Sequence, residues 1–135
     1  MQYEKECNHL HVLESGVSQR DLATSKQMDQ LNTTYQFVPR SFLSYLFEIG
    51  SGCILGSTIS IYSDLLDFYD LGLEDVYSME PGVRIFGDTF SGDFLGFYVD
   101  RPDDQVLEFW HDSNEWHQTG KSFFDYIREI IGTKE

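Results

Sequence analysis

The sequence predicts an α+β domain in which an antiparallel meander sheet packs against N-terminal and C-terminal helices. Three observations support this fold class: helical patterns in the first third, apolar runs separated by turns in the last third, and an amphipathic segment at the end. The 135 residues fit about one domain, and 41% hydrophobic residues supply its core. The helices are expected to cover one sheet face and to leave the other partly open.

Two helical patterns come before the strands. The segment 24–35 has a weak apolar stripe, and a stronger pattern lies between Pro39 and Gly50. Proline is accepted in the first turn of a helix, and glycine ends a helix because it adopts positive φ. A buried helix of about eleven residues is therefore expected after Pro39. Its apolar face consists of Phe42, Leu46 and Ile49, widened by Leu43 and Phe47.

The middle and last thirds contain the predicted strands. Ile59 and Ile61 alternate with polar residues and indicate a strand, and a short helix broken by Gly72 is expected to begin at Ser63 or Asp64. Three apolar runs then form a meander with a fourth strand after the turn HDSNEWHQ. These runs are VRIFG, FLGFYVD and QVLEFWH.

The two ends of the chain differ in how clearly they can be interpreted. The segment KSFFDYIREIIG predicts a C-terminal helix that Ser122 caps, with Asp125 in its first turn and Gly132 at its end. Residues 1–22 show only a weak alternation in HLHVL, which indicates a short strand. We therefore divide the chain into an N-terminal extension of unknown role, 1–22, and a domain, 23–135.

The chain is strongly acidic, with 23 Asp and Glu against 9 Lys and Arg and a net charge of −14. The stretch from Asp64 to Asp104 has 11 acidic residues and 2 basic ones, Arg84 and Arg101, which leaves −9. Such a field repels phosphate, so direct nucleic-acid binding is disfavoured, and it attracts a basic protein partner. The alternative is that the acidity serves solubility alone.

The cysteines and the hydropathy pattern indicate the compartment. Cys7 and Cys53 form neither a metal-binding spacing nor a disulfide framework, so we expect reduced thiols in a cytoplasmic protein. Charges throughout the first 16 residues argue against a secretory signal. The charge-free run 49–63 is too short to span a bilayer, so no membrane partner is expected.

The segment 87–94, GDTFSGDF, is the strongest candidate for a ligand-binding loop. A phosphate loop needs a helix N-terminus and usually a lysine, and this acidic segment leads into a strand. A calcium loop needs alternating oxygen ligands and a closing glutamate, which Asp88 and Asp93 alone do not provide. We interpret the segment as a turn in which Gly87 and Gly92 supply special backbone angles.

The histidines His111 and His117 flank another predicted turn. If residues 113–114 form a two-residue loop, His111 pairs with Trp116 and Trp110 pairs with His117, and a longer loop would change this register. A zinc site would need further ligands that the sequence does not offer. We expect a histidine stacked beside a tryptophan.

No catalytic residue, metal ligand or cofactor site is predicted. Cys53 lies in the apolar segment GSGCILG, where burial would raise the pKa of a thiol, and the chain has no G-x-S-x-G motif. No pair of carboxylates stands out for acid–base catalysis. We expect that the protein is not an enzyme.

Five segments occur in an order that resembles a known superfamily. They are the proline-led helix with its glycine pair (Pro39, Phe42, Leu46, Gly50, Gly52), the strand Ile61-Tyr62-Ser63, the turn from Gly87-Asp88 to Ser91-Gly92-Asp93, the strand from Val106 to Trp110-His111, and the helix start Ser122-Phe123. This order resembles the SUKH superfamily of bacterial immunity proteins and fungal cell-wall-synthesis regulators. The resemblance covers about residues 24–131.

The resemblance implies a non-catalytic protein-binding domain without a cofactor. Bacterial members commonly bind secreted toxins, often nucleases or deaminases, and block them in the producing cell. Such toxins are usually basic, and an acidic inhibitor can occupy the surface meant for phosphates. The residues expected near the contact are Asp88, Asp93, Trp110, His111 and Trp116. The alternatives are a regulatory or scaffolding module, like the fungal members, and a small-ligand pocket lined by tyrosines and tryptophans.

Overall fold

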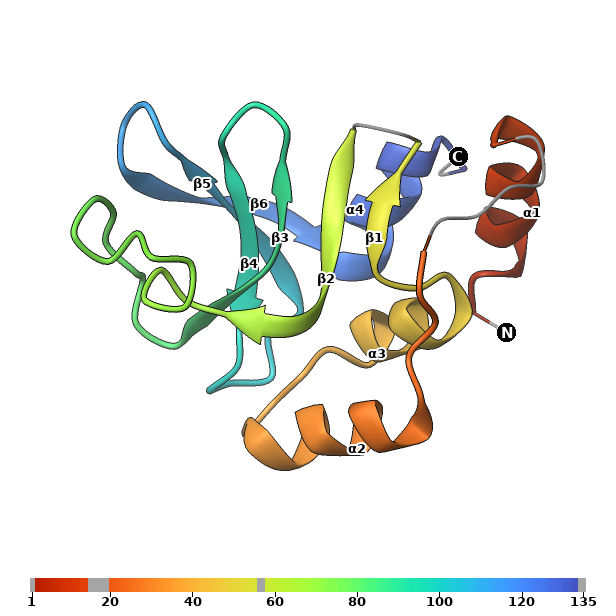
Figure 1. Ribbon diagram of the computed structural model, residues 1–135, viewed down its shortest axis with the longest axis horizontal. Helices are drawn as coiled ribbons and strands as arrows, with labels where there is room; N and C mark the ends of the chain where they lie inside the picture. The colour runs from red at the N-terminus through yellow and green to blue at the C-terminus, as the bar shows by residue number, and fades with distance from the viewer. Residues whose placement is uncertain (1, 15–19, 56–57, 134–135) are drawn as a thin grey trace.

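The computed structural model describes residues 2–14, 20–55 and 58–133, so residues 15–19 of the predicted N-terminal extension lie outside the described residues. The described chain forms four helices and one antiparallel sheet in the order β1-β2-β3-β4-β5-β6 (Figure 1). This confirms the predicted α+β fold with its meander sheet. The helices are α1 (Glu4–Leu13), α2 (Ser25–Thr34), α3 (Arg40–Glu48) and α4 (Phe123–Ile131). The strands are β1 (Gly52–Ile54), β2 (Ile59–Leu66), β3 (Val83–Thr89), β4 (Phe94–Tyr98), β5 (Gln105–Trp110) and β6 (Glu115–Ser122).

One sheet face and the helices share the main hydrophobic core. Four fully buried phenylalanines lie at its centre. Phe42 of α3 packs edge-on against Phe97 of β4 and Phe123 of α4, with ring centroids 5.2 and 5.4 Å apart. Phe86 of β3 stacks on Phe97 at 5.1 Å. These large rings bury much apolar surface and join α3, α4 and the sheet into one unit.

Helix α1 contradicts the short strand expected around Leu10 and Val12. Tyr3, Cys7 and Leu10 recur at helical spacing and pack against the main core, whereas Val12 is 74% exposed. The Tyr3 hydroxyl also donates a hydrogen bond to the backbone oxygen of Ser41, 2.8 Å away. The strand prediction was wrong because the alternation spans only two apolar residues, whereas the stripe of Tyr3, Cys7 and Leu10 gives a helix a buried face.

Helix α3 confirms the helix predicted after Pro39, with nine residues in place of about eleven. Gly50 follows it with φ +101°, as expected for a glycine that ends a helix. A Cβ atom on Gly50 would lie 2.7 Å from the backbone oxygen of Asp21, which pairs with Ser51. Glycine is therefore required both by the backbone angle and by the close approach of the segment before α2.

Strand β2 contradicts the short helix expected to begin at Ser63 or Asp64. The strand continues through these residues to Leu66, with a register shift against β3. After it, Asp67 and Asp70 form a turn in which each carboxylate accepts a hydrogen bond from the backbone N–H of the other, at 2.8 and 3.0 Å. Aspartates that favour a helix start also favour such turns, and here the turn is formed.

The segment 67–82, which connects β2 and β3 at the left of Figure 1, covers part of the second sheet face. The remainder of this face is partly open, as expected, since Cys53 is exposed and Ser60 and Asp88 are partly exposed. Phe68 lies at the centre of this contact and is 1% exposed. Its ring centroid lies 4.9 Å from that of Phe109 and 5.4 Å from that of Phe94. The other members of this second core are Tyr62, Leu71, Leu73, Tyr77, Met79, Ile85 and Trp116.

Helix α4 confirms the predicted C-terminal helix. The Ser122 side chain accepts a hydrogen bond from the backbone N–H of Asp125 at 3.2 Å, and Gly132 follows the helix with φ +91°. Phe123, Ile127 and Ile131 form its buried face.

Removal of this cap gives the first prediction. We expect Ser122→Ala to lower the free energy of unfolding by about 1 kcal/mol, because the N–H of Asp125 then loses its acceptor. Ser122→Asp keeps an acceptor and should retain most of the stability. Urea denaturation followed by circular dichroism measures both variants. Equal losses in the two would show that the hydroxyl matters through something other than capping.

Candidate functional site

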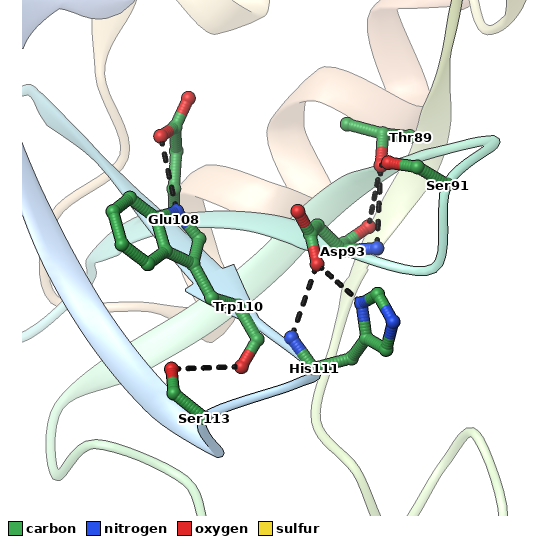
Figure 2. A network of polar contacts seen from close by, with 7 residues as sticks. All are labelled: Thr89, Ser91, Asp93, Glu108, Trp110, His111 and Ser113. Atoms are coloured by element: carbon green, nitrogen blue, oxygen red, sulfur yellow. Dashed lines mark hydrogen bonds and ion pairs between the residues drawn. The ribbon is translucent and has the colours of Figure 1, made fainter.

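The ends of the β3–β4 and β5–β6 hairpins are joined by one aspartate–histidine pair. Asp93 Oδ1 accepts hydrogen bonds from the backbone N–H of His111 at 3.0 Å and from its Nδ1 at 2.6 Å (Figure 2). Because a carboxylate only accepts, Nδ1 carries the proton. Burial by itself raises the pKa of Asp93, but these hydrogen bonds more than offset burial and lower that pKa. The pair fixes the two hairpins relative to each other.

The segment GDTFSGDF forms the β3–β4 turn, which agrees with its interpretation as a turn. The backbone N–H of Thr89 donates to the backbone oxygen of Asp93 at 2.9 Å, and the Thr89 hydroxyl accepts from the N–H of Asp93 at 3.2 Å. Ser91 adds a hydroxyl–hydroxyl contact to Thr89 at 2.8 Å. Gly92 has φ +98° within the turn, as predicted for this position.

Gly87 lies within β3 and not in the turn, so its prediction as a turn residue was wrong. It pairs with Ile61 of β2 and with Leu95 of β4. A Cβ atom at this position would collide with the backbone oxygen of Ser60. Gly87 therefore allows the close approach of β2 and β3.

Trp110 stands at the end of β5, on the sheet face that α4 covers. Glu108, two residues earlier and so on the same face, accepts a hydrogen bond from the Tyr126 hydroxyl of α4 at 2.7 Å. The Trp110 Nε1 donates to the other Glu108 oxygen at 3.4 Å (Figure 2). The ring of Trp110 stacks on that of His117, with centroids 3.6 Å apart and planes 25° apart. The expectation of a histidine stacked on a tryptophan is confirmed.

The β5–β6 hairpin has the longer loop that the sequence left open, so the register of a two-residue loop is not formed. The loop runs from residue 111 to residue 114, which is longer than the two-residue loop considered from the sequence. Trp110 consequently pairs with Glu115, and Glu108 pairs with His117. The stack between Trp110 and His117 is a diagonal contact, which large rings on one face can reach.

Trp116 lies on the opposite face from Trp110. It pairs with Phe109 and packs in the second core. Its Nε1 donates to the backbone oxygen of Ser78, 3.0 Å away in the segment 67–82. The structure therefore gives Trp116 a packing role beneath this segment and does not bring it together with Trp110.

Asp88 also lies on the second face, where it pairs with Phe94 and accepts a hydrogen bond from the Tyr62 hydroxyl. Burial, followed by this hydrogen bond, raises the pKa of Tyr62 well above its ordinary value, so the hydroxyl remains a donor. Of the five residues expected near a partner, the structure brings three together at the hairpin ends. These three are Asp93, Trp110 and His111.

Sequence reasoning missed Glu108, Tyr126 and Phe90 around these three, whereas the sequence already indicates His117 as a stacking partner of a tryptophan. Glu108, His117 and Tyr126 position Trp110 through the contacts described above. Phe90, at the tip of the β3–β4 turn, is an exposed large apolar side chain. The two-residue spacing of Glu108 and Trp110 predicts that both side chains lie on one sheet face. The positions of His117 and Tyr126 relative to Trp110, in contrast, depend on the β5–β6 register and on the docking of α4.

The hairpin ends lie in the most acidic part of the chain. No lysine or arginine occurs between Arg40 and Arg84, or between Arg101 and Lys121. Within the described residues, Arg101 lies 2.8 Å from Asp100 and Lys121 lies 2.6 Å from Glu129, so both cations have acidic partners. The segment 67–82 reaches the β5–β6 loop through Ser78 N–H and the side-chain oxygen of Asn114, 3.3 Å apart. Its acidic residues are Asp67, Asp70, Glu74, Asp75 and Glu80.

The described part of the chain has neither a metal-ligand cluster nor a membrane-spanning helix. In residues 2–14, 20–55 and 58–133, no three histidine, cysteine or acidic side chains are grouped to hold a metal ion. Cys7 and Cys53 are free thiols, and burial raises the pKa of Cys7. No helix among these residues has the length and apolar character needed to cross a membrane.

Comparison with models of protein families gives no match, and neither the curated proteins nor the solved structures contain a match. The proposed function therefore depends on the geometry of the hairpin ends, the charge of the chain and the order of the sequence motifs.

Proposed function

We propose that this chain is a non-catalytic protein-binding domain, and specifically an immunity protein that neutralises a basic toxin of the nuclease or deaminase type. The observation that carries the proposal is an exposed, stacked tryptophan at the end of β5, beside the acidic turns of two hairpins. The resemblance to the SUKH superfamily supplies the biological class, and the charge of −14 supplies the expected sign of the partner.

The proposed contact surface, termed here the hairpin end, consists of the two turns at residues 89–93 and 111–114 together with Trp110 and Glu115. Fixed aromatic side chains give the largest contributions to many protein interfaces, and charges at the rim set the rate of association. The hairpin end offers both. A toxin that binds nucleic acid presents lysines and arginines to phosphate, and an acidic surface competes for the same side chains.

A small-ligand pocket lined by tyrosines and tryptophans has less support. Tyr77, Trp116 and Phe109 pack on Phe68 in the second core, with ring centroids 4.9 to 6.0 Å apart. Rings at these separations contact one another and stabilise the segment 67–82. A regulatory module with several partners remains the alternative class, and it differs from an immunity protein in the number of proteins that it binds.

Co-expression tests the proposal directly. The C-terminal domain of a secreted protein encoded next to this chain is expressed in a bacterial host with and without the full chain, and survival is scored. We expect death without the chain and growth with it, together with a one-to-one complex of the purified proteins. Death in both cultures, with no complex, would contradict the immunity function.

Charge reversal gives the second prediction. We expect the double variant Glu74→Lys/Asp75→Lys to slow association with the toxin roughly tenfold at low salt, because both side chains are exposed on the acidic segment. The dissociation rate should change little. Surface plasmon resonance at several salt concentrations measures both rates.

The matched control is Glu4→Lys/Asp29→Lys, which changes the net charge equally at exposed positions of α1 and α2. This control should slow association much less. If both double variants slowed association equally, the total charge, and not the acidic surface beside the hairpin end, would steer the partner.

A further inference from the structure

Trp110 is exposed to solvent and yet held in one position. The residue is 41% exposed, and one ring face is covered by His117 at a centroid distance of 3.6 Å. The exposed surface of the residue therefore lies away from the ring face that His117 covers. Exposure of a tryptophan costs favourable burial, so a fixed and half-open indole at the end of a strand indicates a contact surface.

Glu108 holds the indole from its edge, and α4 holds Glu108 in turn. One carboxylate oxygen accepts from Trp110 Nε1 at 3.4 Å and the other accepts from the Tyr126 hydroxyl at 2.7 Å. Burial, and then the hydrogen bond to Glu108, raises the pKa of Tyr126, so this hydroxyl remains a donor. A ring fixed in this way loses little rotamer freedom when a partner binds.

Acidic side chains lie on the same sheet face as the ring of Trp110. Glu115 is the cross-strand partner of Trp110 and is exposed. Directly opposed residues in an antiparallel pair have Cβ atoms about 4.5–5.5 Å apart, so the Glu115 carboxylate can reach the edge of the indole. The negative face of the indole and the carboxylates of Glu108 and Glu115 favour a cation.

The geometry distinguishes between the two basic side chains that a partner could present. A lysine ammonium is compact and strongly hydrated, whereas the arginine guanidinium is planar, weakly hydrated and able to stack on a ring while it donates to a carboxylate. The chain contains this packing in Arg101, whose guanidinium carbon lies 4.0 Å from the Tyr98 ring centroid. Arg128 lies over Phe124 in the same manner at 4.9 Å.

We propose that Trp110 and Glu115 form a binding position for one arginine side chain of the partner. The guanidinium stacks on the open indole face and donates to the Glu115 carboxylate, while Glu108 and His117 keep the ring in place. This inference rests on the proposed function, since it names the partner side chain that the hairpin end recognises. It adds a preference for arginine over lysine, which net charge alone does not provide.

Nuclear magnetic resonance of the full chain tests this position with two capped peptides, one of four arginines and one of four lysines. The chain has two tryptophans, which give two indole N–H signals. We expect the Trp110 signal to move with the arginine peptide and the Trp116 signal, from the second sheet face, to stay in place. The arginine peptide should bind about two- to fivefold more tightly than the lysine peptide, because the guanidinium can stack on the ring and donate to Glu115 at once, whereas the ammonium cannot. Equal affinities, or a Trp110 signal that does not move, would overturn the inference.

Two variants with equal charge change sharpen the test. Glu115→Gln should reduce the preference for arginine, whereas Asp29→Asn, at an exposed position of α2, should leave it unchanged. The dispersed Trp116 signal reports that each variant is folded. A preference that survives Glu115→Gln and Trp110→Ala, measured by calorimetry, would overturn the proposed position.

The toxin assay separates this inference from the proposed function. Arginine preference at Trp110 without protection of any toxin-expressing cell would support the binding position and contradict the immunity function. Protection that is equally strong with Trp110→Ala would support the immunity function and overturn the binding position.

Discussion

Replacement of Phe68 by alanine is expected to lower the free energy of unfolding by about 3–5 kcal/mol, the range for truncation of a buried aromatic ring. The ring is 1% exposed and contacts Phe94 and Phe109 of the sheet and Tyr77 of its own segment. The backbone hydrogen bonds of the segment 67–82 lie mostly within the segment, as between Leu73 N–H and the Phe68 oxygen at 2.7 Å, so the side chain of Phe68 supplies much of its attachment to the sheet. The cavity would lie between the segment 67–82 and the sheet.

The neighbouring residue supplies a matched control for this prediction. Tyr69 is 74% exposed, so Tyr69→Ala should change the free energy of unfolding by no more than about 0.5 kcal/mol. Urea denaturation, with the m-value compared between variants, measures both changes. Similar small effects at positions 68 and 69 would show that the segment 67–82 is not packed on the sheet as described.

The same truncation should affect the two tryptophans differently. The Phe68 and Trp116 ring centroids lie 6.0 Å apart, and the Trp116 Nε1 hydrogen bond depends on Ser78 of the segment 67–82. Trp110 lies on the other sheet face. In Phe68→Ala, the Trp116 indole signal should therefore broaden or shift, while that of Trp110 should remain in place.

The elements with local signals could be predicted from the sequence. Helix α4 has an N-cap in Ser122, a glycine end in Gly132 and apolar residues at helical spacing. Helix α3 and strands β3, β4 and β5 have similarly clear local patterns. Each of these signals lies within a dozen residues, so the local sequence is enough to predict the element.

The elements that were missed depend on distant partners. The aspartates at the start of the segment 67–82 suit the first turn of a helix as well as they suit a hydrogen-bonded turn. The local sequence therefore resembles a helix start. Its actual structure is decided by Phe68, which packs on strands far away in the sequence. In α1, Tyr3 and Leu10 contribute to a core formed mostly by later residues. The helix or strand propensity of a short segment does not depend on such distant contacts, so it cannot predict them.

The candidate site was predicted in part for the same reason. Asp93, in a predicted turn, and His111, at the end of a predicted strand, are both expected near the contact, and they meet because β4 and β5 are neighbours in a meander. The positions of Asp88 and Trp116 depend on which way each strand faces and on the length of the β5–β6 loop. A change of one residue in register moves a side chain to the opposite face.

The ion pair between Glu14 and Arg20 gives the second large prediction. Its side chains are 15% and 6% exposed, and Arg20 donates two hydrogen bonds to the carboxylate, at 2.7 and 2.8 Å. Arg20 also donates to the backbone oxygen of Cys53, and Glu14 accepts from the N–H of Leu55. The pair thus connects the end of α1 to β1. We expect Arg20→Met to lower the free energy of unfolding by about 2–3 kcal/mol, because it leaves a largely enclosed carboxylate without its cation and removes two charge-assisted hydrogen bonds.

Acid titration and a double variant distinguish this cause from lost packing. The hydrogen bond from Arg20 lowers the pKa of Glu14, so the pair stabilises the wild type above the ordinary glutamate pKa, and this contribution is lost as pH falls through the lowered value. In Arg20→Met the unpaired carboxyl of Glu14 takes up a proton more readily, so stability relative to wild type should recover on acidification.

The double variant Glu14→Met/Arg20→Met buries no charge and should regain most of the stability at neutral pH. The opposite result would be a double variant that is as unstable as Arg20→Met and has the same pH dependence. In that case the lost hydrogen bonds to Cys53 and Leu55, and not the unpaired charge of Glu14, would explain the loss of stability.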